Sequence, residues 1–166
     1  MVETEHLFLR ELEESDATFL MELDRDLEKI KYFPPPEESQ SIDFQTHNIR
    51  RNQVYYQAFP GLGIWAAIEK EHGAFAGWFA LKHLGKFKDI EIAYCIVEKF
   101  RRKHFATDMA KKLIDHGLNE LGLERILGVV SEENVASRKI LEHIGMTFDE
   151  KKMYNGNELL FYSISS

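Results

Sequence analysis

A change of hydrophobic period between residues 90 and 130 constrains this sequence most. Residues 90–97 have the β-branched and aromatic composition of a strand, and residues 126–130 form a shorter run of the same kind. Between them, residues 103–121 carry apolar side chains on the stripe of an amphipathic helix, and Gly122 supplies its stop. A strand, a helix and a strand in this order predict a parallel pair of strands with a right-handed crossover.

Turn signals divide the rest of the chain into short elements. Three consecutive prolines at Pro34, Pro35 and Pro36 exclude a helix there, because proline lacks the N–H donor and fixes φ. Asn155-Gly156 predicts a tight hairpin between the last two strands. The predicted strands are residues 7–12, 62–68, 75–81, 90–97, 126–130, 146–154 and 158–164, and the predicted helices are a segment capped by Ser15 or Asp16, then about 39–57, 103–121 and 134–144.

This order, β-α-α-β-β-β-α-β-α-β-β, predicts an α/β (α+β) fold. We expect a mixed, mostly antiparallel central sheet of about seven strands flanked by about four helices. The chain has 166 residues, of which 44% are hydrophobic and 30% charged, as in an ordinary globular protein. We therefore expect one domain over residues 1–166.

Charge and cysteine content exclude several classes of function. The formal net charge is −7, which argues against binding to nucleic acid or to an anionic membrane. Cys95 is the one cysteine, so no intrachain disulfide or thiolate zinc cluster can form, and the histidines lack metal-ligand spacing. We expect a cytoplasmic protein without a metal, a nucleic-acid partner or a membrane span.

A basic segment lies where the predicted strand 90–97 meets the long helix. Lys99, Arg101, Arg102 and Lys103 gather there in an otherwise acidic protein. A helix start offers free N–H groups and the positive end of the helix dipole, so this segment has the character of an anion site for a di- or polyphosphate. A solvated basic loop explains the charges alone equally well.

Two stretches of this region resemble a known family. Residues 91–97, followed by Phe100-Arg101-Arg102-Lys103-His104-Phe105-Ala106-Thr107, resemble the acetyl-CoA-binding core of the GNAT superfamily of N-acetyltransferases. Asn134-Val135-Ala136-Ser137, with Leu141, Gly145 and Met146, is similar to that family's last conserved helix. Residues 4–10 resemble the first strand of the Rim-type branch, which acetylates the N-termini of ribosomal proteins.

The resemblance implies acetyl-CoA as co-substrate and a set of residues that hold it. These cofactor-binding residues are Cys95, Ile96, Val97, Arg101, Arg102, Lys103, His104, Phe105, Ala106, Thr107, Asn134, Ser137 and Lys139. Backbone groups of the strand are expected to pair with the pantetheine arm, so the Cys95 side chain is expected to be a small core residue. Helix capping is the alternative role of Asn134.

His104 departs from the family pattern because the signature has glycine at this position. If its backbone is right-handed helical, the amides still face the phosphates and the imidazole points outward. If φ is positive, a side chain is disfavoured there, and weaker cofactor binding is expected.

Glu91 is the predicted general base, since it lies in a strand between Ile90 and Ile92 where water is partly excluded. An edge-facing surface carboxylate is its alternative. Many family members protonate the thiolate with a tyrosine, but Leu141 stands at that position, and the Rim-type branch implies Ser137 as the substitute.

The expected reaction is direct attack of a primary amine, either a protein N-terminus or a small molecule, on the thioester in a ternary complex. Phe33, Trp78 and Tyr94 are the predicted residues of the acceptor pocket, although aromatic residues on strands are more often core. The protein is expected to be a monomer or a homodimer. A degenerate, non-catalytic binding domain on the same fold is the alternative, because His104 replaces glycine and the tyrosine is missing.

Overall fold

The computed structural model describes residues 2–166, which form seven strands and five α-helices with short 3₁₀ and π segments between them. The strands are β1 (Leu7–Glu11), β2 (Gly63–Glu69), β3 (Phe75–His83), β4 (Ile90–Ile96), β5 (Arg125–Val130), β6 (Thr147–Tyr154) and β7 (Asn157–Ser165). The helices are α1 (Ala17–Leu23), α2 (Leu27–Ile30), α3 (Ile42–Ala58), α4 (Phe105–Asp115) and α5 (Val135–His143).

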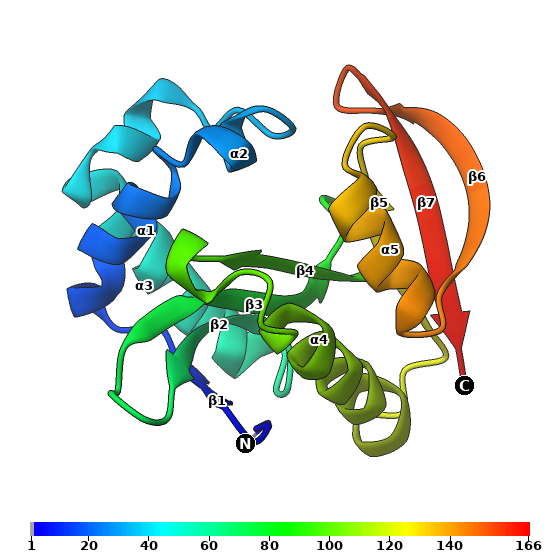
Figure 1. Cartoon of the computed structure of the whole chain (residues 1–166), viewed down its shortest axis with the longest axis horizontal. Helices are drawn as coiled ribbons and strands as arrows, with labels where there is room; N and C mark the ends of the chain where they lie inside the picture. The colour runs from blue at the N-terminus through cyan, green and yellow to red at the C-terminus, as the bar shows by residue number, and fades with distance from the viewer. Residues whose placement is uncertain (1) are drawn as a thin grey trace.

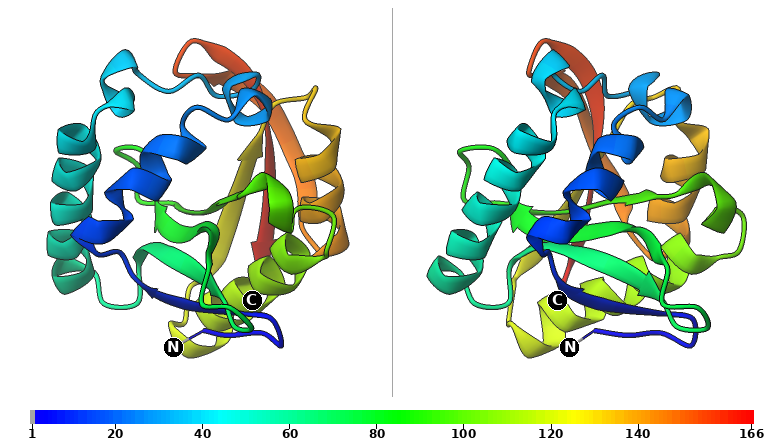
Figure 2. Two further views of the ribbon diagram at one scale, coloured as in Figure 1. Left: turned by 60° about the vertical axis from the view of Figure 1, so that its left-hand side comes forward. Right: turned by 90° about the vertical axis from the view of Figure 1, so that its left-hand side faces the viewer.

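All seven strands belong to one sheet, in the order β1-β2-β3-β4-β5-β7-β6. Every neighbouring pair is antiparallel except β4 and β5, which are parallel, as the strand–helix–strand pattern predicts. Helices α1 and α3 pack together beside β2 and β3, whereas α4 and α5 pack beside β4 and β5 (Figures 1 and 2). The predicted mixed, mostly antiparallel fold is therefore confirmed.

The sheet contacts two large apolar cores and a third, small apolar cluster of Leu84, Leu127, Leu159 and Phe161. Helix α4 buries a single stripe of side chains, Phe105, Met109, Ala110, Leu113 and Ile114, in the larger core. The smaller core lies under α1 and α3 and contains Ile49 and Ala66 among its buried members. Because both faces of the central strands are covered, consecutive residues of β3 are buried, at positions 75–77 and 79–81.

Several element boundaries differ from the sequence expectation. Helix α2 was not predicted, because four residues with two charges carry too little periodic signal. Helix α3 begins at Ile42 behind the N-cap Ser41, since residues 37–40 form a 3₁₀ turn. The long helix begins at Phe105 rather than residue 103, and residues 116–120 continue it as a π-helix.

The last two strands, β6 and β7, are joined by the hairpin turn that Asn155-Gly156 predicts. Asn155 and Gly156 both have positive φ, 48° and 79°, as a two-residue hairpin turn of the primed type requires. Strands β6 and β7 pair antiparallel around this turn, as predicted. None of the helices in residues 2–166 combines the length and the apolar character needed to cross a bilayer.

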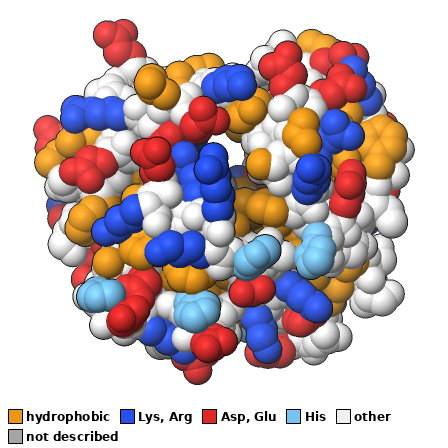
Figure 3. All heavy atoms as spheres, in the orientation of Figure 1, with side chains coloured by type: hydrophobic (Ala, Val, Ile, Leu, Met, Phe, Trp, Pro, Cys, Tyr) orange, Lys and Arg blue, Asp and Glu red, His pale blue; other side chains and the backbone are white. Residues whose placement is uncertain are grey.

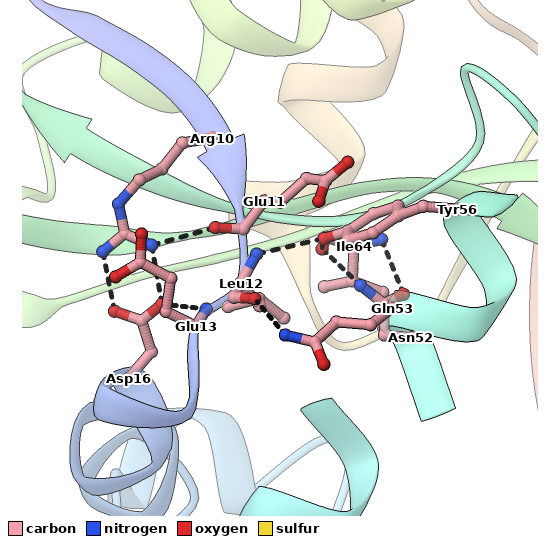
Figure 4. A network of polar contacts seen from close by, with 9 residues as sticks. All are labelled: Arg10, Glu11, Leu12, Glu13, Asp16, Asn52, Gln53, Tyr56 and Ile64. Atoms are coloured by element: carbon pink, nitrogen blue, oxygen red, sulfur yellow. Dashed lines mark hydrogen bonds and ion pairs between the residues drawn. The ribbon is translucent and has the colours of Figure 1, made fainter. Parts of the chain in front are cut away.

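A polar network fastens the end of β1 to α3 and β2 (Figure 4). The Arg10 guanidinium binds Asp16 through two bonds of 2.7 and 2.8 Å, and the Asp16 side chain is 1% exposed. The Tyr56 hydroxyl accepts the N–H of Leu12 at 3.1 Å and donates to the carbonyl of Ile64. Burial raises the pKa of Tyr56 to about 12, so this hydroxyl stays a donor at neutral pH. The network fixes one wall of the cavity described next.

Candidate active site

Strand β4 separates from β5 halfway along its length. The two strands pair only through Ile90, Glu91 and Ile92, which lie opposite Ile126, Leu127 and Gly128. Beyond Ile92 the β4 backbone remains paired with β3 but has no registered partner on its β5 side (Figure 1). The edge that carries Cys95 and Ile96 can therefore accept an added strand-like ligand.

The pairing of β3 with β4 decides which side chains share a face. Trp78 lies opposite Cys95 and Lys82 lies opposite Glu91, and since side chains alternate along a strand, all four point to one face. Trp78 and Lys82 line a cavity of about 390 Å³ between the sheet and helices α1 and α3. Tyr94 points to the other face, where it stacks on Phe79 at 5.5 Å. The predicted base is thus on the cavity side of β4.

Of the three predicted pocket residues, the structure brings one to this cavity. Trp78 is among the lining residues, whereas Tyr94 packs in the α4 and α5 core. Phe33 lies in the loop after α2, is 43% exposed and does not line the cavity. The assignments of Phe33 and Tyr94 to the acceptor remain predictions without a place in this cavity.

Glu91 has a partner that sequence analysis did not identify. Its carboxylate forms an ion pair with the Lys82 ammonium across the β3–β4 register, and its side chain is 13% exposed. Lys82 itself lines the cavity, so the pair stands at the cavity's sheet side. A carboxylate held in this way has a fixed position beside Lys82, which lines the cavity, whereas a freely rotating surface carboxylate has no fixed position.

The loop before α4 has the backbone of an anion site. Arg102 and His104 have φ values of 61° and 62°, so the conformation where the family signature has glycine is left-handed. The N–H groups of residues 105–107 form the first helical turn and have no acceptor in the part of the chain that the structure describes. Left-handed residues next to a helix start turn successive N–H groups toward one point, which favours a phosphate.

The side chains of the basic segment divide between two neighbours. Arg101 pairs with Asp26, the N-cap of α2, and its Nε donates to the Ile96 carbonyl at 3.0 Å. Lys99 and Lys103 lie over the Phe100 ring, 4.8 and 5.6 Å from its centroid. On the face of the molecule seen in Figure 1, Figure 3 shows a hollow near the middle with Lys and Arg side chains on both flanks. Arg101 thus ties the loop before α4 to α2, whose Lys29 lines the cavity.

Helix α5 presents the remaining predicted residues from the opposite side. The Asn134 side chain caps the helix by accepting the N–H of Ser137 at 3.2 Å, the alternative role anticipated for it. The Tyr94 hydroxyl is buried and has no hydrogen-bond partner among residues 2–166. Burial raises the pKa of Tyr94 to about 12. The nearby Ser137 side chain lowers that pKa in part, although the two side chains do not form a hydrogen bond of ordinary geometry. Lys139 is exposed on the helix surface.

His104→Gly is expected to stabilise the protein by about 0.5–1 kcal/mol. A residue with a side chain costs about 1–2 kcal/mol in the left-handed conformation, and glycine removes this cost. The greater flexibility that glycine gives the unfolded chain offsets part of the gain. We expect the loop to have this backbone both with and without acetyl-CoA. The cost then affects folding rather than cofactor binding, unlike the weaker binding considered from the sequence, and the acetyl-CoA dissociation constant should change less than about threefold. Urea unfolding and calorimetry measure both quantities. Lys103→Gly, at an adjacent residue without positive φ, is the control and should destabilise. A tenfold tighter complex of His104→Gly would show that strain arises on binding.

Cys95 is expected to be an unreactive thiol. Burial raises the pKa of its thiol to about 11, although Lys29 and Arg101 act in the opposite direction. At pH 7.5 the thiolate is then on the order of 100-fold scarcer than in an exposed cysteine, and iodoacetamide should modify the folded protein slower than the urea-unfolded protein by at least that factor. Mass spectrometry follows the reaction. Equal rates in both states would contradict the structural role expected for this side chain.

Three side chains in the β2–β3 turn bring metal-binding atoms together: Glu69, Glu71 and His72. The Glu69 carboxylate already accepts the N–H groups of Glu71 and His72 at 2.8 and 3.0 Å. These bonds account for the arrangement as a turn, and the expectation that the protein needs no metal stays a prediction.

Comparison with known proteins identifies the family. Residues 6–147 match the Acetyltransferase (GNAT) domain. The chain is 31% identical to the uncharacterized N-acetyltransferase YoaA of Bacillus subtilis, over 87% of this chain and 81% of that protein. It is 30% identical to the putative ribosomal N-acetyltransferase YdaF of Bacillus subtilis, over 96% and 91%. Its fold matches the microcin C7 self-immunity acetyltransferase MccE, solved with acetyl-CoA and AMP, with a TM-score of 0.81, 19% identity and coverage of 98% and 94%.

The chain belongs to the GNAT family of acetyltransferases. The predictions of an N-acetyltransferase, of acetyl-CoA as its donor and of a resemblance to ribosomal N-acetyltransferases are confirmed. The residues present also fit this donor: the free edge of β4 and the N–H groups at the start of α4 provide the two kinds of backbone contact that a pantetheine arm and a pyrophosphate need.

Sequence analysis missed Lys82 and Asp26, the ion-pair partners of Glu91 and Arg101. Neither carries a local signal, because Lys82 depends on the strand register and Asp26 is 75 residues from Arg101. The polar face of α3 was also missed. Its residues Asn48, Arg51, Asn52 and Tyr55 occupy positions i, i+3, i+4 and i+7, a spacing that predicts one face of a helix.

Proposed function

We propose that the chain transfers the acetyl group of acetyl-CoA to a primary amine by direct attack in a ternary complex, with Glu91 as general base. The observation that carries this proposal is the location of Glu91. Its ion pair with Lys82 stands at the sheet side of the 390 Å³ cavity, on the strand whose free edge fits the donor. Bound acetyl-CoA supplies the activated acetyl thioester.

The two faces of β4 divide the chemistry between them. On the cavity face, the Glu91 carboxylate accepts the proton that the amine releases as the new C–N bond forms. On the α5 face, Ser137 donates a hydrogen bond toward the departing sulfur, with Asn134 holding the first turn of that helix. Backbone N–H groups of Ile96 or Val97 are the candidates that polarise the carbonyl, although Val97 already donates to Ala76 at 2.9 Å.

The acceptor amine is left open by the relatives. The name of YdaF points to a ribosomal protein, whose N-terminal amine is one candidate, and a small-molecule amine is the other. A monomeric or homodimeric state, a cytoplasmic location and the lack of a nucleic-acid partner likewise stay predictions.

The proposal is tested first by calorimetric titration of the protein with acetyl-CoA, and then by thiol release with peptides and small amines. We expect binding without an amine and thiol release only when an amine is present. Absence of binding at millimolar acetyl-CoA would overturn the proposal. Binding without thiol release for any amine would instead support the non-catalytic alternative, which no observation in this structure favours.

A further inference from the structure

The cavity beside Glu91 has a polar roof whose groups are mostly engaged within the protein. The roof is the face of α3 that carries Gln45, Asn48, Arg51, Asn52 and Tyr55. Gln45 donates to Asp24 and to the Ser39 carbonyl at 2.8 and 2.9 Å, and Asn52 exchanges two bonds with the Ile64 backbone at 2.9 and 3.1 Å. The Tyr55 hydroxyl pairs with the His83 ring.

Two roof residues have no partner anywhere in residues 2–166. Asn48 and Arg51 make no hydrogen bond or ion pair within that part of the chain, although they lie three residues apart on the same face of α3. The other cations of the lining are already neutralised, because Lys29 pairs with Asp24 and Lys82 pairs with Glu91. The free polar side-chain groups of the cavity in residues 2–166 are therefore one guanidinium and one carboxamide at its α3 side, and the indole N–H of Trp78 on the sheet.

The chemistry of the two groups on α3 selects a carboxylate. A guanidinium presents parallel N–H donors that match the two oxygens of a carboxylate, and a carboxamide adds a neutral donor without a competing charge. The opposite, sheet side holds Glu91, where the reacting amine is needed. Between the two ends the walls are apolar and include Leu20, Ile49 and Trp78.

We propose that the acceptor is a small primary amine with an apolar body and a free carboxylate, in the manner of an apolar amino acid, and that Arg51 and Asn48 bind its carboxylate. This inference rests on the proposed function, since it names the substrate of that same site. The volume of about 390 Å³ suits such a molecule and lies near the lower end of the roughly 300–1,000 Å³ typical of ligand pockets. A polyamine has no anionic group that could bind Arg51. A protein N-terminus has no carboxylate as close to its amine as the carboxylate of an amino acid is.

The test compares L-leucine, L-phenylalanine and L-methionine with their carboxamides as acceptors. In the wild-type enzyme the acids should have kcat/KM values at least about tenfold above those of the amides. This preference cannot come from amine basicity, because the amides have the less basic amines and so more free nucleophile. In Arg51→Met the preference should fall to within about threefold, through loss of activity toward the acids alone.

Arg50→Met is the matched control, because Arg50 directly precedes Arg51 in α3 but pairs with Glu14 at 2.7 Å outside the cavity. It should keep the wild-type preference. Spermidine and the peptide amide Leu-Ala-Ala-NH₂ are the competing acceptors. Preference for either of them, or equal rates for acids and amides in the wild-type enzyme, would overturn the inference while leaving the acetyltransferase intact.

A binding arm separates failure of the inference from failure of the proposed function. Calorimetry with L-leucine and L-leucinamide needs no turnover, and the acid should bind more tightly in the wild-type protein and equally in Arg51→Met. If the acid binds selectively but no thiol is released, the cavity assignment stands and the proposed reaction falls. If neither compound binds while thiol release proceeds with other amines, the reaction stands and the assignment falls.

Discussion

Glu91→Gln is expected to lower turnover about 10²–10⁴-fold while leaving acetyl-CoA binding unchanged, because glutamine keeps the shape of the side chain but cannot accept the proton of the amine. Glutamine can still accept a hydrogen bond from Lys82, so the position of the side chain should be kept. Thiol release under steady-state conditions gives the rate, and calorimetry gives the affinity for acetyl-CoA.

The pH dependence of this variant separates a base from a structural residue. At high pH the amine loses its proton to water, so the deficit of Glu91→Gln should narrow as the pH rises toward the pKa of the acceptor amine. A residue that only supports the strand would give a deficit independent of pH. Glu124→Gln, an exposed carboxylate next to β5, is the control and should behave as the wild type. Full activity of Glu91→Gln would remove Glu91 as the base.

Arg10→Met is expected to lose about 3–5 kcal/mol of unfolding free energy, because it leaves the Asp16 carboxylate, 1% exposed, without its cation. Asp16 would keep the N–H of Glu13 at 2.8 Å as a partner, which does not neutralise its charge. Urea unfolding followed by circular dichroism at pH 7 measures the loss.

A neighbouring exposed ion pair provides the matched control. Arg50 and Glu14 have side chains 63% and 50% exposed, so Arg50→Met should cost less than about 1 kcal/mol. The double variant with Arg10→Met and Asp16→Leu should recover part of the loss, since a buried ion pair replaced by apolar residues no longer contains an isolated charge. Equal losses for Arg10→Met and Arg50→Met would show that burial of Asp16 has no energetic effect.

Local patterns predicted most of the fold. The strands of the meander, the amphipathic stripe of α4 and the Asn155-Gly156 hairpin all have the positions expected from composition and periodicity. Helix α2 escaped prediction because its four residues span only about one period of the hydrophobic pattern, too few for the pattern to repeat. Phe19 on α1 shows a second limit, because an apolar side chain does not by itself indicate burial: Phe19 is 45% exposed and stacks on Phe75 at 5.0 Å.

The site was less predictable because its geometry depends on long-range pairing. Glu91 could be proposed from its strand, but the partner that orients it follows from the register of β3 with β4. The signature around His104 indicated a phosphate loop, whereas the sign of φ there is a property of the folded backbone. Residues Asn48 and Arg51 became informative only once their neighbours' bonds were known to be complete.

The separation of β4 from β5 also affects the mechanics of the molecule. A sheet that is continuous through only three residue pairs at its centre consists of two blocks, β1–β4 and β5–β7, with a weak joint between them. A donor bound along the open edge would add backbone hydrogen bonds at that joint, so it would stiffen the sheet as well as react. We therefore expect the rigidity of the central sheet to rise when the donor binds.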